Sequence, residues 1–200
     1  GSPHTYLPID GLPLYDNAVQ KLVFGEDNIV LKEKRAATVQ AIGGTGALKI
    51  GADFLKRFSP DSQVWISNPS WENHRALFEY AGFKVNTYPY YDPASHGVDF
   101  NGMIGTLKTL PARSVVILHA CCHNPTGADL SDAQWDEVIE VVRDRKLIPF
   151  LDMAYQGFSE GIESDGQIVR RFSQRYSPVL VSNSFSKSFS LYGERVGAFS

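Results

Sequence analysis

The sequence has 200 residues, a length that fits one domain or two small ones and is ample for a continuous hydrophobic core. Hydrophobic residues make up 43% and charged residues 20%, a balance typical of soluble globular chains. Nineteen Lys and Arg stand against 22 Asp and Glu, so the net charge of −3 excludes a broad basic surface for nucleic acid or an anionic membrane. Adjacent Cys121 and Cys122 form no disulfide framework, which favours a reducing, cytoplasmic location.

The two ends of the sequence suggest a piece of a longer chain. We interpret Gly1 and Ser2 as the remnant of an expression tag and place the domain at residues 3–200. Residues 195–200 form an apolar run without a helix stop or a turn, which is typical of a strand. No leader pattern and no run of 18 apolar residues occurs, so the sequence predicts neither secretion nor a membrane span.

Short apolar runs alternate with longer amphipathic segments along the chain. Ser131 and Gln134 form a capping-box pattern at the start of one such segment. The continuously apolar runs 115–118 and 147–151 are typical of parallel strands buried on both faces. The pattern predicts an open α/β sheet with right-handed crossovers. Strands are predicted at 35–42, 63–67, 83–88, 114–120, 147–152 and 178–182, and helices at 46–58, 71–81, 100–110, 131–145 and 167–176.

Chemistry-bearing residues follow several of these strands, where open α/β sheets bind their ligands. The glycine-rich turn 43–46 could hold a phosphate on its free N–H groups, or could be only a turn that connects a strand to a helix. Trp71 follows an Asn-Pro turn and is either half-buried or stacked on a flat ligand. His74, three residues further, is most simply a structural hydrogen-bonding residue.

Residues 119–127 contain two histidines and two cysteines, which raises the question of a zinc site. Adjacent cysteines on an extended segment point to opposite faces, and no second ligand pair follows at zinc-finger spacing. We therefore expect no metal. Asn124 belongs either to a plain turn or to a site where its amide donates a hydrogen bond to a ligand.

Two charged residues complete the set of strand-end positions. Asp152 closes a buried strand, which is costly unless the carboxylate meets a cation or several donors. Tyr155 follows three residues later. Lys187 stands among hydroxyls and aromatic rings, and is either an exposed loop lysine or a nucleophile that forms a Schiff base. A phosphate cradle, a stacking ring, an amide, a carboxylate, a phenol and a lysine together match the parts of pyridoxal phosphate (PLP).

Five motifs resemble those of the class I aminotransferases, in the aspartate and aromatic amino acid subgroup, and the resemblance covers residues 6–200. It implies a three-layer α/β/α fold with a mostly parallel sheet, the large PLP-binding domain of fold type I. Gly43 stands where many relatives carry serine, and Ser190 where many carry glycine. The motifs are residues 68–74, 123–127, 152–158, 184–187 and 191–195, and the segment 182–195 leans towards the bacterial aromatic enzymes.

The resemblance implies a role for each residue around the cofactor ring. Lys187 would form the Schiff base with PLP and later move the proton at the substrate Cα. Asp152 would pair with the pyridine nitrogen and keep it protonated. Asn124 and Tyr155 would donate to the phenolic oxygen, and Trp71 would stack on the ring.

The resemblance also implies how the phosphate and the carboxylate are supported. Gly44 and Thr45 would hold the phosphate together with Ser184 and Arg195. Tyr6 would reach the phosphate of the neighbouring subunit in a homodimer. Two histidines, His74 and His119, would support Asp152 without reacting.

The function implied by the resemblance is an enzymatic amino transfer from an aromatic or acidic amino acid to a 2-oxo acid such as 2-oxoglutarate. In the family the small domain comes from both chain ends, and the arginine that binds the substrate α-carboxylate lies beyond Ser200. We therefore expect this part alone to be weakly active or inactive. Two alternatives stay open. The first is a non-catalytic PLP-binding module of a regulator, and the second is another fold type I enzyme such as a decarboxylase or a β-lyase.

Overall fold

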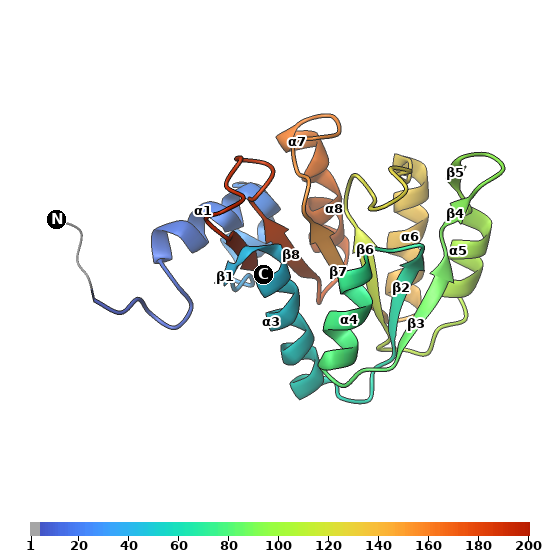
Figure 1. Ribbon diagram of the computed structural model, residues 1–200, viewed down its shortest axis with the longest axis horizontal. Helices are drawn as coiled ribbons and strands as arrows, with labels where there is room; N and C mark the ends of the chain where they lie inside the picture. Colours follow the sequence, from blue (N-terminus) through green and yellow to red (C-terminus); the bar gives the residue numbers. More distant parts are fainter. Residues whose placement is uncertain (1–4) are drawn as a thin grey trace.

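The computed structural model describes residues 5–200, so the predicted tag remnant at residues 1–2 lies outside the described part. A seven-stranded sheet with the order β1-β9-β8-β7-β6-β2-β3 forms the centre of the molecule (Figure 1). Of these seven strands, β9 alone runs in the opposite direction to the other six, which confirms the mostly parallel sheet. The strands are β1 (Val39–Ile42), β2 (Val64–Asn68), β3 (Val85–Pro89), β6 (Val115–His119), β7 (Ile148–Met153), β8 (Leu180–Ser184) and β9 (Val196–Phe199).

Helices cover both faces of the sheet. The face bearing Val115 and Ile117 packs against α3 (Gly43–Phe58) and α4 (Glu72–Tyr80). The opposite face, bearing Val116 and Leu118, packs against α1 (Pro13–Phe24), α5 (Phe100–Leu107), α6 (Asp132–Asp144) and α8 (Gln167–Arg175). Alternate residues of β6 therefore enter two separate cores, as expected for a strand buried on both sides. The three-layer α/β/α prediction is confirmed.

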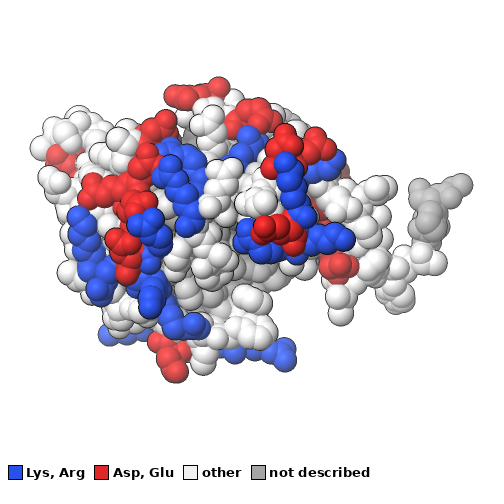
Figure 2. All heavy atoms as spheres, turned by 180° about the vertical axis from the view of Figure 1, so that it is seen from behind, with Lys and Arg blue, Asp and Glu red and all other residues white. Residues whose placement is uncertain are grey.

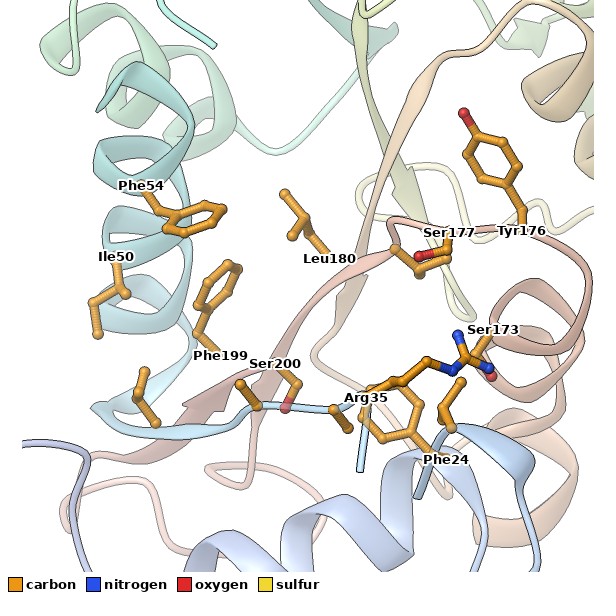
Figure 3. Close-up of a pocket in the computed structure, with 15 residues that line it drawn as sticks. Phe24, Arg35, Ile50, Phe54, Ser173, Tyr176, Ser177, Leu180, Phe199 and Ser200 are labelled. Carbon is orange, nitrogen blue, oxygen red and sulfur yellow. The ribbon is translucent and has the colours of Figure 1, made fainter. Parts of the chain in front are cut away.

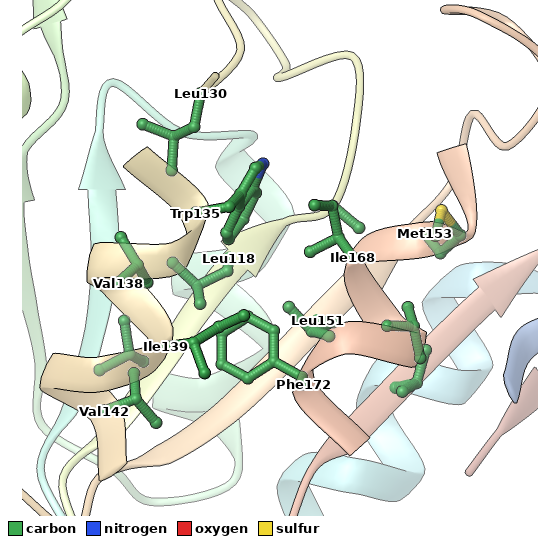
Figure 4. Packing of buried hydrophobic residues seen from close by; sticks show 14 of the residues in the cluster. Leu118, Leu130, Trp135, Val138, Ile139, Val142, Leu151, Met153, Ile168 and Phe172 are labelled. Carbon is green, nitrogen blue, oxygen red and sulfur yellow. The ribbon is translucent and has the colours of Figure 1, made fainter. Parts of the chain in front are cut away.

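The larger core lies between β6, β7 and the pair α6 and α8. Figure 4 shows Trp135 of α6 and Phe172 of α8 beside Leu118 and Leu151 of the sheet. The centres of the two aromatic rings lie 6.1 Å apart. The predicted capping box at Ser131 is present and starts α6.

On the surface seen in Figure 2, acidic and basic side chains are interspersed, and that face has no broad area of a single charge sign.

The start of α3 differs from the prediction. The glycine-rich segment forms the first turn of the helix instead of a loop before it, because Gly43 adopts a φ of +66° and turns β1 directly into the helix. Gly197 of β9 allows this packing, since a Cβ there would lie 2.4 Å from the Gly43 carbonyl oxygen. The N-terminus of α3 consequently lies directly beside β9 and β8.

Four smaller elements and α1 have no counterpart in the predicted set. Helix α1 begins at Pro13 after Leu12, and no side chain of the described residues caps it. It packs through Val19 and Val23 against the core. The other additions are α2 (Ile29–Lys32), α7 (Ile162–Asp165) and the short hairpin of β4 (Tyr91–Asp92) and β5 (Gly97–Val98). Within residues 5–200, no helix combines the length and the apolar character needed to cross a membrane.

Candidate active site

The predicted site residues converge on one cavity of about 350 Å³ at the carboxyl ends of β6, β7 and β8. Parallel strands place the residues that follow them at a common edge, which explains why segments far apart in sequence meet there. Of the twelve predicted residues, only Tyr6 and His74 do not line it. Those that do are Gly44, Thr45, Trp71, His119, Asn124, Asp152, Tyr155, Ser184, Lys187 and Arg195.

A second cavity of about 350 Å³ lies at the opposite end of β8 and differs in chemistry. Phe54, Leu180 and Phe199 supply much of its apolar lining, and Arg35 lies at its border (Figure 3). None of the predicted site residues lines this second cavity. The first cavity is therefore the candidate active site.

Asp152 is the central charged group of the candidate active site. Its Oδ2 lies 2.7 Å from His74 Nε2, and its Oδ1 accepts a hydrogen bond of 3.2 Å from the Ser182 hydroxyl. Burial by itself raises the pKa of Asp152, but the hydrogen bond and charge of His74, with smaller effects from His119 and Ser182, hold that pKa below its ordinary value. Asp152 is thus a buried, ionised carboxylate whose remaining capacity faces the cavity.

His74 lies behind the cavity, fully buried, and connects Asp152 to a further pair of polar side chains. Ser70 Oγ lies 2.9 Å from His74 Nδ1 and 3.5 Å from His119 Nε2. The backbone N–H of Asn124 donates to His119 Nδ1 at 3.3 Å, so a neutral His119 carries its proton on Nε2, towards Ser70. Burial, followed by the charges of His74 and His123, holds the pKa of His119 well below its ordinary value. His74 thus contacts Asp152 directly, whereas His119 is connected to His74 through Ser70.

An anion-binding geometry occupies the side of the cavity nearest α3. The Gly43 N–H at the start of α3 donates to the Arg195 carbonyl at 2.9 Å. The N–H groups that follow it in the first turn have no side-chain cap among the described residues, so they can bind an anion. A Cβ on Gly44 would lie 2.9 Å from Ser184 Cβ, and therefore only glycine allows this approach. The Arg195 guanidinium donates to Ser186 Oγ at 3.2 Å, which aims it at the same corner. Helix N–H groups, hydroxyls and a guanidinium are the donors that phosphate prefers.

Lys187 and Tyr155 are in direct contact inside the cavity. Lys187 Nζ lies 3.8 Å from the centre of the Tyr155 ring, within the range of a cation–π interaction. Lys187 belongs to the loop that follows β8, and Tyr155 to the turn that follows β7. The lysine amine is therefore held next to the residues around Asp152 instead of extending into solvent.

Tyr6 is the predicted residue that lies elsewhere. Its side chain is fully exposed and does not contact the cavity of its own chain. Five further residues line the cavity although they were not predicted as site residues. Ser186 and Tyr192 lie within the recognised motifs, and this position in the sequence could have indicated them. Cys121 was considered only as a metal ligand. The five are Leu48, Cys121, Ala154, Ser186 and Tyr192.

Comparisons with known proteins agree with this geometry. The family model described as aminotransferase class I and II matches residues 1–200. The chain is 62% identical over 195 residues to the aromatic-amino-acid aminotransferase of Escherichia coli strain K12, covering 98% of this chain and 49% of that protein. It is 60% identical to an aspartate aminotransferase of Pseudomonas aeruginosa, covering 100% of this chain and 50% of the relative.

Solved structures show the same similarity. An aromatic amino acid aminotransferase from Burkholderia cenocepacia superimposes with a TM-score of 0.98 at 59% identity, covering 100% of this chain and 50% of that one. The aromatic-amino-acid aminotransferase of Burkholderia pseudomallei, whose structure has pyridoxal phosphate covalently bound, gives 0.98 at 60% identity with the same coverage. The chain spans about half the length of the relatives it matches. The family model matches this chain along the chain's whole length, and the superimposed structures share the fold type I architecture. The chain therefore belongs to the class I and II aminotransferases, in the aspartate and aromatic amino acid subgroup.

Proposed function

We propose that residues 3–200 are the cofactor-binding large domain of an aminotransferase that uses pyridoxal 5′-phosphate. The amino group would pass from an aromatic or acidic amino acid to a 2-oxo acid such as 2-oxoglutarate. One observation is central to this proposal: Lys187, Asp152 and an anion-binding helix N-terminus line one cavity. The names of the relatives, which include both aromatic-amino-acid and aspartate aminotransferases, support the two donor classes.

The residues of the cavity fit the parts of PLP. Gly44, whose missing Cβ opens the approach to Ser184, would hold the phosphate together with Thr45 and Arg195. Asp152, with its lowered pKa, offers a permanent negative charge for a protonated ring nitrogen.

The remaining residues of the cavity match the ring of the cofactor. Trp71 offers a flat face, and Asn124 and Tyr155 offer donors for the phenolic oxygen. This donor set complements a phosphorylated, nitrogen-containing aromatic ring, which makes PLP the cofactor of the proposal.

When bound, PLP supplies an aldehyde that takes up an amine and a ring that accepts electrons from the substrate Cα. The chain's own residues prepare the site for this chemistry. Lys187 Nζ is the primary amine of the cavity and would hold the proton that moves at the substrate Cα. His74 and Ser182 keep Asp152 ionised and oriented through their hydrogen bonds.

The direct test of this function is a half-reaction. The full-length protein that contains residues 3–200, loaded with PLP and given an aromatic amino acid, should convert the cofactor to its amino form, and 2-oxoglutarate should then restore the aldehyde form. Carbon dioxide release, or ammonia without the amino form, would contradict amino transfer and favour a decarboxylase or a β-lyase. A Lys187→Ala variant is the control, since it keeps the phosphate residues and lacks the amine.

The proposal includes a homodimer in the cytoplasm. Tyr6 is fully exposed and lies apart from its own cavity, as a residue that completes a neighbour's phosphate site would. Leu7 and Ile9, which follow Tyr6 in the sequence, and Leu14 at the start of α1 are also exposed, and such apolar surface is of the kind that protein interfaces bury. Cys121 and Cys122 are both free thiols, which supports a reducing compartment.

A further inference from the structure

His123 is the one histidine of the 119–127 motif to which the proposed function assigns no role. Its side chain is only 2% exposed and does not line the candidate active site. It immediately precedes Asn124, whose amide does border the cavity. A buried histidine next to a ligand-facing residue can act on the site through the loop it holds.

The hydrogen bond at Nε2 has a determined direction. Ser67 Oγ donates its proton to the carbonyl of Pro69 at 2.8 Å. A serine hydroxyl has one proton, so the same oxygen must accept at its second contact, which is His123 Nε2 at 2.8 Å. His123 therefore carries a proton on Nε2 and donates it to Ser67 near the end of β2.

The opposite ring nitrogen is bonded in the complementary sense. Thr126 Oγ1 lies 2.7 Å from His123 Nδ1 and also accepts the backbone N–H of Ala128 at 3.2 Å. Burial, with a smaller effect from the charge of His74, lowers the pKa of His123 to about 4, so the ring is neutral near pH 7. A neutral ring protonated on Nε2 accepts at Nδ1, and Thr126 is its donor.

Two aromatic rings pack against His123. The Tyr90 ring stacks on it with centroids 3.9 Å apart and an interplanar angle of 17°, and the His119 ring centroid lies 4.2 Å away at an interplanar angle of 39°. Tyr90 also donates its hydroxyl to the Ala128 carbonyl at 2.6 Å. The segment 123–128 is thus bound to β2 through Ser67 and to the β3 end through Tyr90, which leaves Asn124 little freedom.

We propose that His123 is a positioning residue that, as a neutral Nε2-protonated bridge between Ser67 and Thr126, sets the place of the Asn124 amide in the cofactor cavity. The effect on Asn124 rests on the proposed function, in which that amide donates to the phenolic oxygen of PLP. The tautomer itself does not rest on it, because it follows from the Ser67 and Thr126 contacts alone.

The first experiment reads the tautomer without cofactor. Two-dimensional ¹H–¹⁵N spectra of the full chain, labelled on histidine, should show His123 with a protonated Nε2 and an unprotonated Nδ1 at pH 7. Assignment uses His123→Gln. In Thr126→Val the Nδ1 resonance should move towards the value of a free acceptor, and Thr126→Ser should restore it. A proton on Nδ1 would overturn the proposal.

The second experiment reads the effect on Asn124. In the PLP-loaded chain, the pH midpoint of the visible cofactor band should rise by about half a unit in Thr126→Val, because a weakened donor stabilises the phenolate less. Asn124→Ala should give a larger rise in the same direction. Thr126→Ser should return the midpoint to that of the wild type.

A matched control removes a hydroxyl of the same kind elsewhere. Thr106 bonds the Gly102 carbonyl within α5, away from the cavity, so Thr106→Val should leave the midpoint unchanged. An unshifted midpoint in Thr126→Val alongside a shifted one in Asn124→Ala would contradict the positioning role. If the wild type shows no Lys187-dependent band, the proposed function fails, and the histidine spectra still decide the tautomer. Should His123→Gln not fold, Ser67→Ala replaces it as the variant that breaks the bridge.

Discussion

His74 Nε2 lies 2.7 Å from Asp152 Oδ2, and the histidine is completely buried. This contact gives the buried carboxylate a hydrogen-bond partner in place of the water that burial excludes. Because the Ser182 hydroxyl donates to Oδ1, both carboxylate oxygens have a partner, and their remaining lone pairs are available to the cavity that Asp152 lines. Replacing either partner therefore changes both the stability of the fold and the charge that the candidate active site presents.

Substituting His74 by leucine should destabilise the protein by about 2–4 kcal/mol, since it leaves a buried carboxylate with only Ser182 as a donor. The pKa of Asp152 should rise at the same time, and the affinity for PLP should fall. Urea denaturation and cofactor titration measure the two effects. The control is Arg75→Ala on the same helix, where the exposed pair with Glu79 contributes less than about 1 kcal/mol. Equal losses in both variants would contradict this account.

Folding stability should decrease as the pH falls from about 6.5 towards 4. His119 and His123 have folded pKa values below their ordinary value, so the unfolded chain binds protons more readily in this window. Because the folded pKa of His123 is about 4, this residue alone should lower the free energy of unfolding by about 2 kcal/mol between pH 7 and pH 5. Asp152, whose pKa is also lowered, loses its contribution only at more acid pH.

Urea unfolding at pH 7 and pH 5 measures this dependence. The hydroxyl of Tyr90, whose ring stacks on His123, stays protonated over that range because burial raises its pKa. His123→Gln should flatten the decline, whereas His96→Gln, at an exposed position, should not. Stability that is unchanged or higher at pH 5 would show that the two histidines are not buried in the neutral form.

Gly44→Ala should weaken PLP binding by about tenfold to a hundredfold, because the added methyl would lie 2.9 Å from Ser184 Cβ and displace the phosphate donors. Fluorescence titration with PLP measures the change. Gly105 of α5 provides the matched control, since a Cβ there meets no atom of the described residues within 4 Å. Gly105→Ala should leave binding intact and stabilise the helix by about 0.5–1 kcal/mol. Unaltered affinity in Gly44→Ala would place the phosphate elsewhere.

The contact of Lys187 with the Tyr155 ring predicts a difference between two tyrosine variants. Tyr155→Phe keeps the ring beneath the ammonium group, whereas Tyr155→Leu removes it. A cation–π contact of about 0.5–1 kcal/mol implies that an amine-directed reagent should label Lys187 roughly two to five times faster in the leucine variant. Peptide mass spectrometry quantifies the labelling. Equal rates in the two variants would mean that the ring does not hold the amine.

The sequence predicted the main strands and most site residues because both depend on local signals. Asp152 lies at the end of one apolar strand and Lys187 follows another, and a parallel sheet brings strand ends together whatever the lengths of the connections. Helix α1 escaped prediction because it begins without a side-chain cap, and its apolar face is recognisable only against the core it covers.

The relations between side chains could not be read from the sequence in the same way. The role of Ser67 depends on a hydroxyl meeting a histidine 56 residues later in the chain. The first turn of α3 likewise depends on Gly197, which becomes its neighbour only when β9 inserts between β1 and β8. Such pairings arise from tertiary packing, and no motif in either segment indicates them.

The most direct test of the central claim is to locate the lysine that binds PLP. The full chain is incubated with PLP, reduced with borohydride, digested and examined by mass spectrometry, with Lys187→Ala in parallel. The account predicts a pyridoxyl group on Lys187 and no comparable labelling in the variant. Labelling of other lysines at equal extent in both proteins, with Lys187 unmodified, would contradict it.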